Sequence, residues 1–202
     1  TNIGAHRPQD AGNYYAWGET TPKTDFRWAT YAHGTADNSL TKYSQEDGLW
    51  TLDATDDVVS CTWGGTWRMP TKNEWSELQE HCVWTWTDDY NQTGVAGYVV
   101  ASKSSDASLF LPAAGCRYAN QINEKGVHGY YWSSSLFTNH PSYRGSAYQL
   151  QFFQAIVKSN WNYTRYYGSS VRGVCPAPTT KSAGSTQSNR AINAMGGKTH
   201  FN

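Results

Sequence analysis

The segment 66–84, TWRMPTKNEWSELQEHCVW, carries the local pattern that most restricts how this chain can fold. Thr71 is followed three residues later by Glu74, which is the spacing of a capping box at the start of a helix. Apolar residues then recur at i, i+3 and i+7, along one helical face: Trp75, Leu78 and Cys82. The pattern predicts a helix over about 71–82, and a second helix is expected near 54–60.

Strand patterns replace the helical period after residue 96. Short apolar runs separated by polar turns predict strands at 97–103, 108–115, 129–135, 146–153 and 170–174. In SAYQLQFF, the expected strand at 146–153, large apolar residues alternate with glutamines. An aromatic segment at 12–19 indicates a further short strand. One or two helices followed by antiparallel strands and long loops indicate the α+β class.

The composition fits a single domain. The chain has 202 residues, a formal net charge of +0 and only 16% charged residues, so it lacks the basic field expected of a nucleic-acid-binding protein. No run approaches the ~20 apolar residues of a membrane span, and the first residues lack the pattern of a signal peptide. We expect one domain over 1–175 and a polar tail over 176–202, which is rich in Ser, Thr, Gly and Asn.

The cysteines and histidines show no spacing that predicts a metal or redox site. The four cysteines stand far apart without a CxxC pair, so disulfides with three possible connectivities and free buried thiols both stay open: Cys61, Cys82, Cys116 and Cys175. The six histidines lack the spacing of metal ligands, and no nucleophile elbow or phosphate-binding glycine loop is present. We therefore predict no catalytic residue, no metal site and no cofactor.

Residues 129–174 hold seven of the fourteen tyrosines, together with many asparagines and serines. Tyrosine offers a large, stiff contact area at low conformational cost, and serine, glycine and asparagine add adaptable hydrogen bonds. Such residues usually stand on loops held by a rigid scaffold. The composition indicates a surface built for contact, with packing of the same tyrosines inside the domain as the alternative.

Four blocks carry a resemblance to a known family: WRMPTKNEWSEL at 67–78, FLPAAG at 110–115, GYYWSSS at 129–135 and GSSVRGV at 168–174. Over residues 12–175 the chain resembles the C-type-lectin-fold domains of bacterial surface proteins, in the branch related to formylglycine-generating enzymes. Within that branch it is most similar to the variable proteins of diversity-generating retroelements. The resemblance implies a C-type lectin fold with one or two helices, antiparallel strands and long ligand-binding loops, whose C-terminal part forms the binding face.

The resemblance also divides residues 129–174, the candidate variable region, into scaffold and display positions. In diversified members, mutagenesis of template adenines rewrites asparagine-type codons to residues such as Tyr, Ser, His, Phe or Arg, but not to Trp, Lys, Gln, Glu or Met. Trp161 and Lys158 should then be fixed, and Trp161→Ala should damage folding. Tyr163→Ala or Tyr166→Ala should damage only binding. The candidate ligand-binding residues are Phe137, Asn139, His140, Ser142, Tyr143, Asn160, Asn162, Tyr163, Arg165, Tyr166 and Tyr167.

Three functions follow from the residues and the resemblance together. The first, which we predict, is a ligand-binding display protein or adhesin at a cell or virion surface, diversified by a retroelement, that binds a protein or glycan on another cell or particle. The second is an adhesin of the same fold with fixed specificity. The third is a formylglycine-generating-type oxidoreductase, which would need Cys116 or Cys175 in a reactive cysteine pair. The chain is expected not to be an enzyme.

Overall fold

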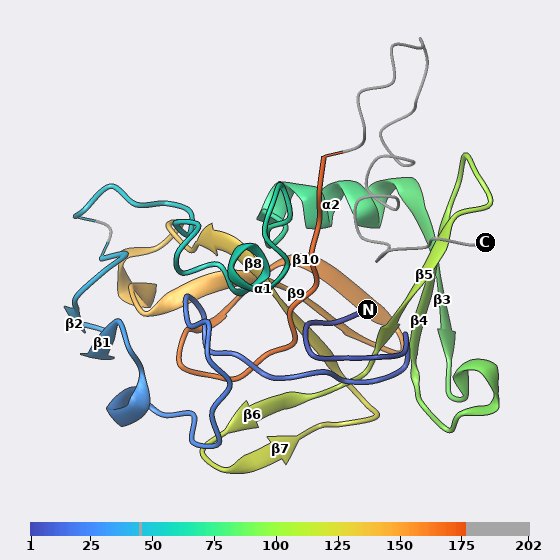
Figure 1. Cartoon of the computed structure of the whole chain (residues 1–202), viewed down its shortest axis with the longest axis horizontal. Coiled ribbons are helices and arrows are strands. Elements are labelled where there is room, and N and C mark those ends of the chain that lie inside the picture. Colours follow the sequence, from blue (N-terminus) through green and yellow to red (C-terminus); the bar gives the residue numbers. More distant parts are fainter. Residues whose placement is uncertain (45, 177–202) are drawn as a thin grey trace, which may run out of the picture.

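The computed structural model describes residues 1–44 and 46–176, and Figure 1 shows the order of its elements. Strands make up 37% of the structure and helices 14%, and the strands form several small antiparallel sheets. The expected α+β class is therefore wrong, because the fold is mostly β, and the expected C-type lectin fold is not confirmed. The helical pattern does form a helix, but the helix is short. The polar segments around it form turns and single bridges instead of further helices. The expected tail lies outside the described residues, apart from Pro176.

The helix predicted over 71–82 is confirmed as α2 (Lys72–His81). Its capping box is formed, because the Thr71 hydroxyl accepts the Glu74 N–H at 3.2 Å and the Glu74 carboxylate accepts the Thr71 N–H at 2.8 Å. The predicted apolar face is buried against the sheets: Trp75, Leu78 and Cys82.

The earlier helix forms a few residues later than expected near 54–60, as α1 (Val58–Trp63). Asp57 caps it by accepting the N–H groups of Val59 and Ser60 at 2.8 and 3.1 Å. The second oxygen of the same carboxylate accepts the N–H of Met69 at 2.7 Å, which ties the helix to the segment that leads into α2.

One three-stranded antiparallel sheet has the order β3-β4-β5. The hairpin predicted from 97–103 and 108–115 is confirmed as β4 (Gly97–Ser102) and β5 (Ser108–Pro112). The pattern did not predict β3 (Cys82–Thr87), which follows α2 without a linking turn. Its sequence, CVWTWT, is rich in the β-branched and aromatic residues that favour strands.

The other three-stranded sheet has the order β10-β9-β8. The strands predicted at 129–135 and 146–153 are confirmed as β8 (Gly129–Leu136) and β9 (Ser146–Phe153). An edge strand, β10 (Ile156–Thr164), was not expected, because its run KSNWNYT is too polar for the apolar-run pattern. The expected strands at 170–174 and 12–19 form isolated bridges instead, such as those between Arg172 and Asn2 and between Tyr15 and Ser169.

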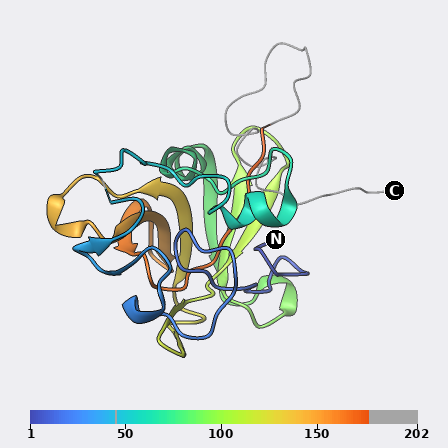
Figure 2. The same cartoon turned by 60° about the vertical axis from the view of Figure 1, so that its left-hand side comes forward.

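Short elements surround the two sheets (Figure 1). The β6–β7 hairpin lies on the side of the β10–β9–β8 sheet opposite to α2. In Figure 2 the chain before α1 runs as long loops that carry only short elements. The bounds of these elements are η1 Trp28–Thr30, β1 Gly34–Ala36, β2 Ser39–Leu40, η2 Tyr90–Gln92, β6 Cys116–Tyr118, β7 Gln121–Asn123 and η3 Pro141–Tyr143.

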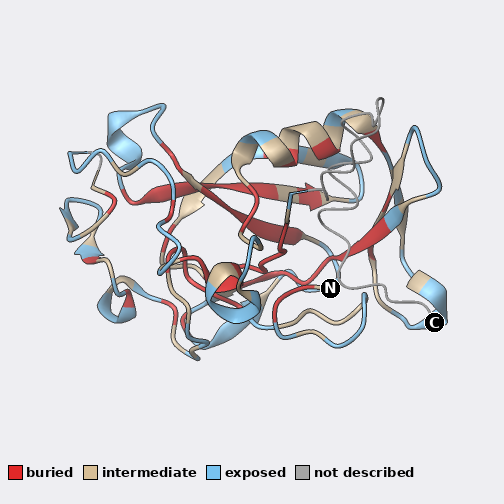
Figure 3. Ribbon diagram, turned by 45° about the horizontal axis from the view of Figure 1, so that its top comes forward, coloured by how far each residue is buried: buried red, intermediate tan, exposed pale blue. Residues whose placement is uncertain are grey.

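The core follows β8 and β9, which are buried along most of their length (Figure 3). On one face, Leu150 and Phe152 of β9 pack with Trp75 of α2 and with the β4–β5 hairpin. On the other face, Trp132 of β8 packs with the N-terminal segment. Only glycine fits at Gly129, because a Cβ there would lie 2.1 Å from the Phe152 ring. Strands β8 and β9 thus form a fixed scaffold, with β10 at the edge of the sheet and the loops at its ends.

Candidate ligand-binding surface

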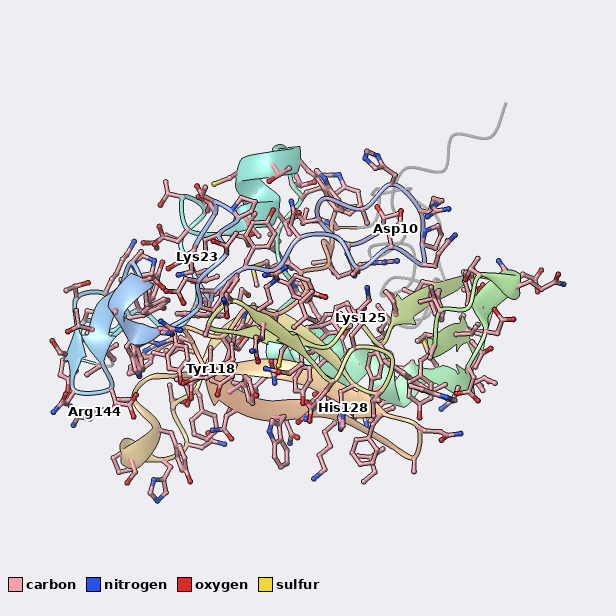
Figure 4. The ribbon with its side chains drawn as sticks, turned by 90° about the horizontal axis from the view of Figure 1, so that it is seen from below. Asp10, Lys23, Tyr118, Lys125, His128 and Arg144 are labelled. Atoms are coloured by element: carbon pink, nitrogen blue, oxygen red, sulfur yellow. The ribbon has the colours of Figure 1, made fainter. Side chains whose placement is uncertain are left out.

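The β10–β9–β8 sheet has two faces, and α2 covers one of them. Lys72 of α2 places its Nζ 4.4 Å from the centre of the Tyr148 ring on β9. Side chains alternate along a strand, so Trp161, whose partner on β9 is Gln149, and Tyr163 lie on the opposite face. Figure 4 is a view from below, toward this second face.

Tyrosine rings line that face in a continuous row, which we call the tyrosine row. Ring centroids are 4.8 Å apart between Tyr166 and Tyr167, 4.6 Å between Tyr167 and Tyr163, and 5.5 Å between Tyr163 and Tyr130. Tyr118, from the β6–β7 hairpin, stacks beside Tyr167 at 5.2 Å. The row brings together three candidate residues from the end of β10 and the turn after it.

The two ends of the tyrosine row differ in burial. At the inner end, Tyr130 is buried and its hydroxyl donates to the Glu124 carboxylate. The Tyr163 hydroxyl lies 4.0 Å from the Cys116 sulfur, and burial raises the pKa of this phenol. At the outer end Tyr118 is 44% exposed. The inner rings therefore hold the row in place, and the outer rings are open to a ligand.

The loop between β8 and β9 contributes a second aromatic group. Residues 138–144 are all exposed, while Phe137 is buried at the start of the loop. The Phe137 and Tyr143 ring centroids lie 6.0 Å apart, and those of Tyr143 and His140 lie 5.5 Å apart. The His140 Nδ1 accepts the Ser142 N–H at 3.2 Å, which fixes the turn. The exposed candidate residues here are Asn139, His140, Ser142 and Tyr143.

The edge strand β10 has a mixed surface. Asn160 is exposed and Asn162 is half-buried, on either side of Trp161, which is 40% exposed. The Lys158 Nζ stands 4.4 Å from the centre of the Trp161 ring, a cation–π contact. The pairing with β9 shifts between Lys158 and Trp161, so a bulge turns this part of the strand outward.

Arg165, a candidate ligand-binding residue, is fully buried and takes no part in this surface. Its guanidinium donates to the main-chain carbonyls of Tyr43 and Arg144, both at 3.1 Å, and lies 5.4 Å from the Trp17 ring. It joins the N-terminal segment to the loop before β9. Arg165 was a candidate because arginine is among the residues that adenine mutagenesis can produce, and only the fold shows the carbonyls that bind it.

The cysteines offer no activated thiol. Cys61, Cys82, Cys116 and Cys175 are all free. Burial raises the pKa of Cys82 and Cys116 to about 11, and burial also raises the pKa of Cys61 and Cys175. A nucleophilic cysteine needs a lowered pKa. The oxidoreductase alternative thus receives no support from these thiols.

Three aromatic residues of this face were not predicted from the sequence. Tyr118 lies outside the 129–174 segment, in a short hairpin without a strand pattern. Trp28, whose ring lies 5.0 Å from that of Tyr166, comes from the N-terminal half. His128 lies 5.8 Å from Tyr130, by ring centroids, at the start of β8. The sequence shows that these residues are aromatic, but it does not show the contacts that bring them together.

Within residues 1–44 and 46–176, no helix is long and apolar enough to cross a membrane, and no group of three or more His, Cys, Asp and Glu side chains could hold a metal ion. Comparisons with protein-family models, curated proteins and solved structures gave no match.

Proposed function

We propose that this chain is a ligand-binding display protein or adhesin. Its binding surface combines the loop 138–144, the exposed side of β10 and the outer end of the tyrosine row, and is called the display surface below. The observation that carries the proposal is that all candidate residues except Phe137 and Arg165 keep exposed or half-exposed side chains on these neighbouring elements.

The chemistry of the display surface suits a protein or glycan ligand. Trp161 and Tyr143 are large exposed rings, and such rings carry much of the energy of protein interfaces. Asn139, Ser142 and Asn160 surround them with adaptable hydrogen-bonding groups. The formal net charge of +0 provides no general attraction for a strongly charged partner, so shape and hydrogen bonds determine which ligand binds.

Retroelement diversification is the preferred version of this proposal. The loop residues Asn139, His140, Ser142 and Tyr143 belong to the types that adenine mutagenesis produces, and they are exposed on a loop whose side chains can change without disturbing the core. A fixed-specificity adhesin is the second candidate. It is favoured by Trp161 and Lys158, which such mutagenesis cannot produce and which are both exposed on β10. In both versions the protein acts at a cell or virion surface.

Binding of labelled protein to cells of the source community, followed by flow cytometry, tests the display surface. We expect the variant Tyr143→Ala/Trp161→Ala/Tyr166→Ala to lose binding and Val83→Ala, which changes an exposed residue of β3 outside the surface, to retain it. Equal binding by all three proteins would show that the ligand binds elsewhere. Protease treatment of the cells should abolish binding to a protein ligand, and periodate oxidation should abolish binding to a glycan.

Sequencing separates the two versions. The codons for residues 129–175 would be read from a population of the source organism, together with the flanking DNA. Substitutions confined to adenine-bearing codons, beside a near-copy of the segment and a reverse transcriptase gene, would support diversification. An invariant segment without such neighbours would leave the fixed-specificity adhesin.

A further inference from the structure

A cavity of about 960 Å³ lies between α1, the β4–β5 hairpin and the N-terminal segment that contains His6 and Pro8. Figure 2 shows α1 and the β4–β5 hairpin next to the N-terminus. No residue of the display surface lines this cavity. We propose that it is a separate binding site for a neutral saccharide of mono- or disaccharide size. Its volume falls within the roughly 300–1,000 Å³ of small-molecule sites.

Two aromatic pairs form the walls of the cavity. Trp63 and Trp67 meet edge to face, with ring centroids 5.0 Å apart and planes at 85°. Tyr90 stacks on Phe110, with centroids 3.9 Å apart and planes at 7°. Flat aromatic walls match the C–H faces of a pyranose ring, which are apolar although the rim of the ring carries hydroxyl groups.

Both walls rest on glycines and are therefore held in place before a ligand arrives. A Cβ at Gly173 would lie 2.3 Å from Cζ3 of Trp63, so the indole packs directly on the main chain. A Cβ at Gly97 would lie 2.8 Å from Cζ of Phe110, the ring on which Tyr90 stacks. A site whose walls are already ordered loses less conformational entropy on binding.

Accessible polar groups on the cavity walls can bond a ligand with many hydroxyl groups. The indole N–H groups of Trp63 and Trp67 and the carboxamide of Asn91 belong to residues that line the cavity, and none of them is among the buried polar atoms without a partner in the described part of the chain, so a ligand can reach them. Asn91 lies at φ +50°, in the left-handed region that asparagine adopts more readily than most residues, within the turn that carries Tyr90.

The charges of the lining favour a neutral ligand over a charged one. Asp89 and Arg172 both line the cavity, so neither sign of charge dominates it. A purely apolar ligand would leave the indole N–H groups and the Asn91 carboxamide without partners, which costs free energy on burial. A neutral saccharide fits both conditions, because it offers hydroxyl donors and acceptors beside apolar C–H faces.

The indole N–H resonances of the full chain, in two-dimensional ¹H–¹⁵N NMR spectra, report directly on the site. The probes are methyl α-D-glucopyranoside, methyl β-D-galactopyranoside, maltose and N,N′-diacetylchitobiose at millimolar concentration, with benzoate and tetramethylammonium as charged comparators. Trp63→Phe and Trp67→Phe each remove one resonance and so assign it. We expect at least one saccharide to shift both resonances in a saturable way.

Two variants keep the test specific. Tyr90→Leu removes one wall and should weaken the apparent Kd about tenfold or more, whereas Trp161→Phe, on the display surface, should leave it unchanged. Near-ultraviolet circular dichroism confirms that both variants are folded. Several results would overturn the proposal: no shift with any saccharide, a shift of the Trp161 indole alone, equal affinity in Tyr90→Leu, or shifts with benzoate or tetramethylammonium only.

Discussion

The side chain of Gln79 is hydrogen-bonded to the main chain of Ser159, with its Oε1 accepting the N–H at 3.1 Å. Its Nε2 donates to the carbonyl of Val157 at 2.9 Å. Because β9 pairs with the other side of β10, these bonds satisfy the outer edge of the sheet with one helical side chain. An unpaired strand edge can attract another chain, so Gln79 of α2 both docks the helix and protects the edge.

Replacing Gln79 by Leu should therefore destabilise the fold, because two main-chain groups lose their partners. We expect a loss of about 1–3 kcal/mol in the free energy of unfolding, measured by urea denaturation. Gln154→Leu, at an exposed turn between β9 and β10, is the matched control and should change little. An equal loss in both variants would mean that Gln79 does not hold β10.

Trp161 and Tyr163 exchange the roles expected from the sequence. Trp161 is 40% exposed, whereas Tyr163 packs against the core and contacts Cys116 and Tyr130. Tyr163→Ala should destabilise the protein by about 2 kcal/mol or more, and Trp161→Ala should stay within about 1 kcal/mol of the wild type while weakening ligand binding. Thermal unfolding of the two variants side by side decides between this assignment and the reverse.

The sequence predicts those elements of this fold that depend on residues close together in the chain. Thr71 and Glu74 are close in sequence and form a cap whatever surrounds them, so α2 could be predicted. The apolar runs of β4, β8 and β9 are equally local. The fold class could not be predicted in this way, because it depends on how many further segments pair.

The display surface depends on longer-range contacts. β10 is polar because one side of it faces solvent, and the pairing with β9 that makes it a strand is a tertiary interaction. Arg165 is buried because carbonyls distant in sequence, those of Tyr43 and Arg144, converge on it. Neither fact leaves a local pattern, so the sequence identified the region of the surface but not which residues face outward.

The buried Arg165 should be essential for folding and not for binding. Arg165→Met leaves the carbonyls of Tyr43 and Arg144 without their donor, and we expect a loss of about 3 kcal/mol in the free energy of unfolding. Arg144→Met removes an exposed pair with Glu46 and should cost well under about 1 kcal/mol. Urea denaturation measures both. A stable Arg165→Met protein that fails to bind would restore Arg165 as a ligand-binding residue.

Glu74 should make stability depend on pH at the acidic end. Burial alone would raise the pKa of its carboxyl group, but hydrogen bonds from the Arg68 guanidinium and the Thr71 N–H outweigh burial and lower it. A lowered folded-state pKa contributes stability above the unfolded-state value, and this stability is lost as the pH falls through the folded-state pKa. Glu74→Gln should therefore be less stable than the wild type at pH 7.

Urea denaturation of Glu74→Gln and the wild type between about pH 2 and 7 measures this difference. The difference in unfolding free energy between the wild type and Glu74→Gln should become smaller as the pH falls into the acid range. Glu77→Gln, on the same helix but outside the capping box, serves as the control and should stay within about 0.5 kcal/mol of the wild type at pH 7. A gap that stays constant with pH would mean that Glu74 acts through its shape and not through its charge.

The burial of the cysteines predicts the order in which a thiol reagent reaches them. Cys61 is exposed, Cys175 is half-buried, and Cys82 and Cys116 are buried with pKa values raised to about 11. Thiolates react and thiols do not, so iodoacetamide at pH 7 should modify Cys61 first and leave Cys82 and Cys116 unmodified until the protein is unfolded. Mass spectrometry of peptides after timed labelling gives the order. Rapid modification of Cys116 in the native protein would indicate an activated thiol beside Tyr163 and would reopen the oxidoreductase alternative.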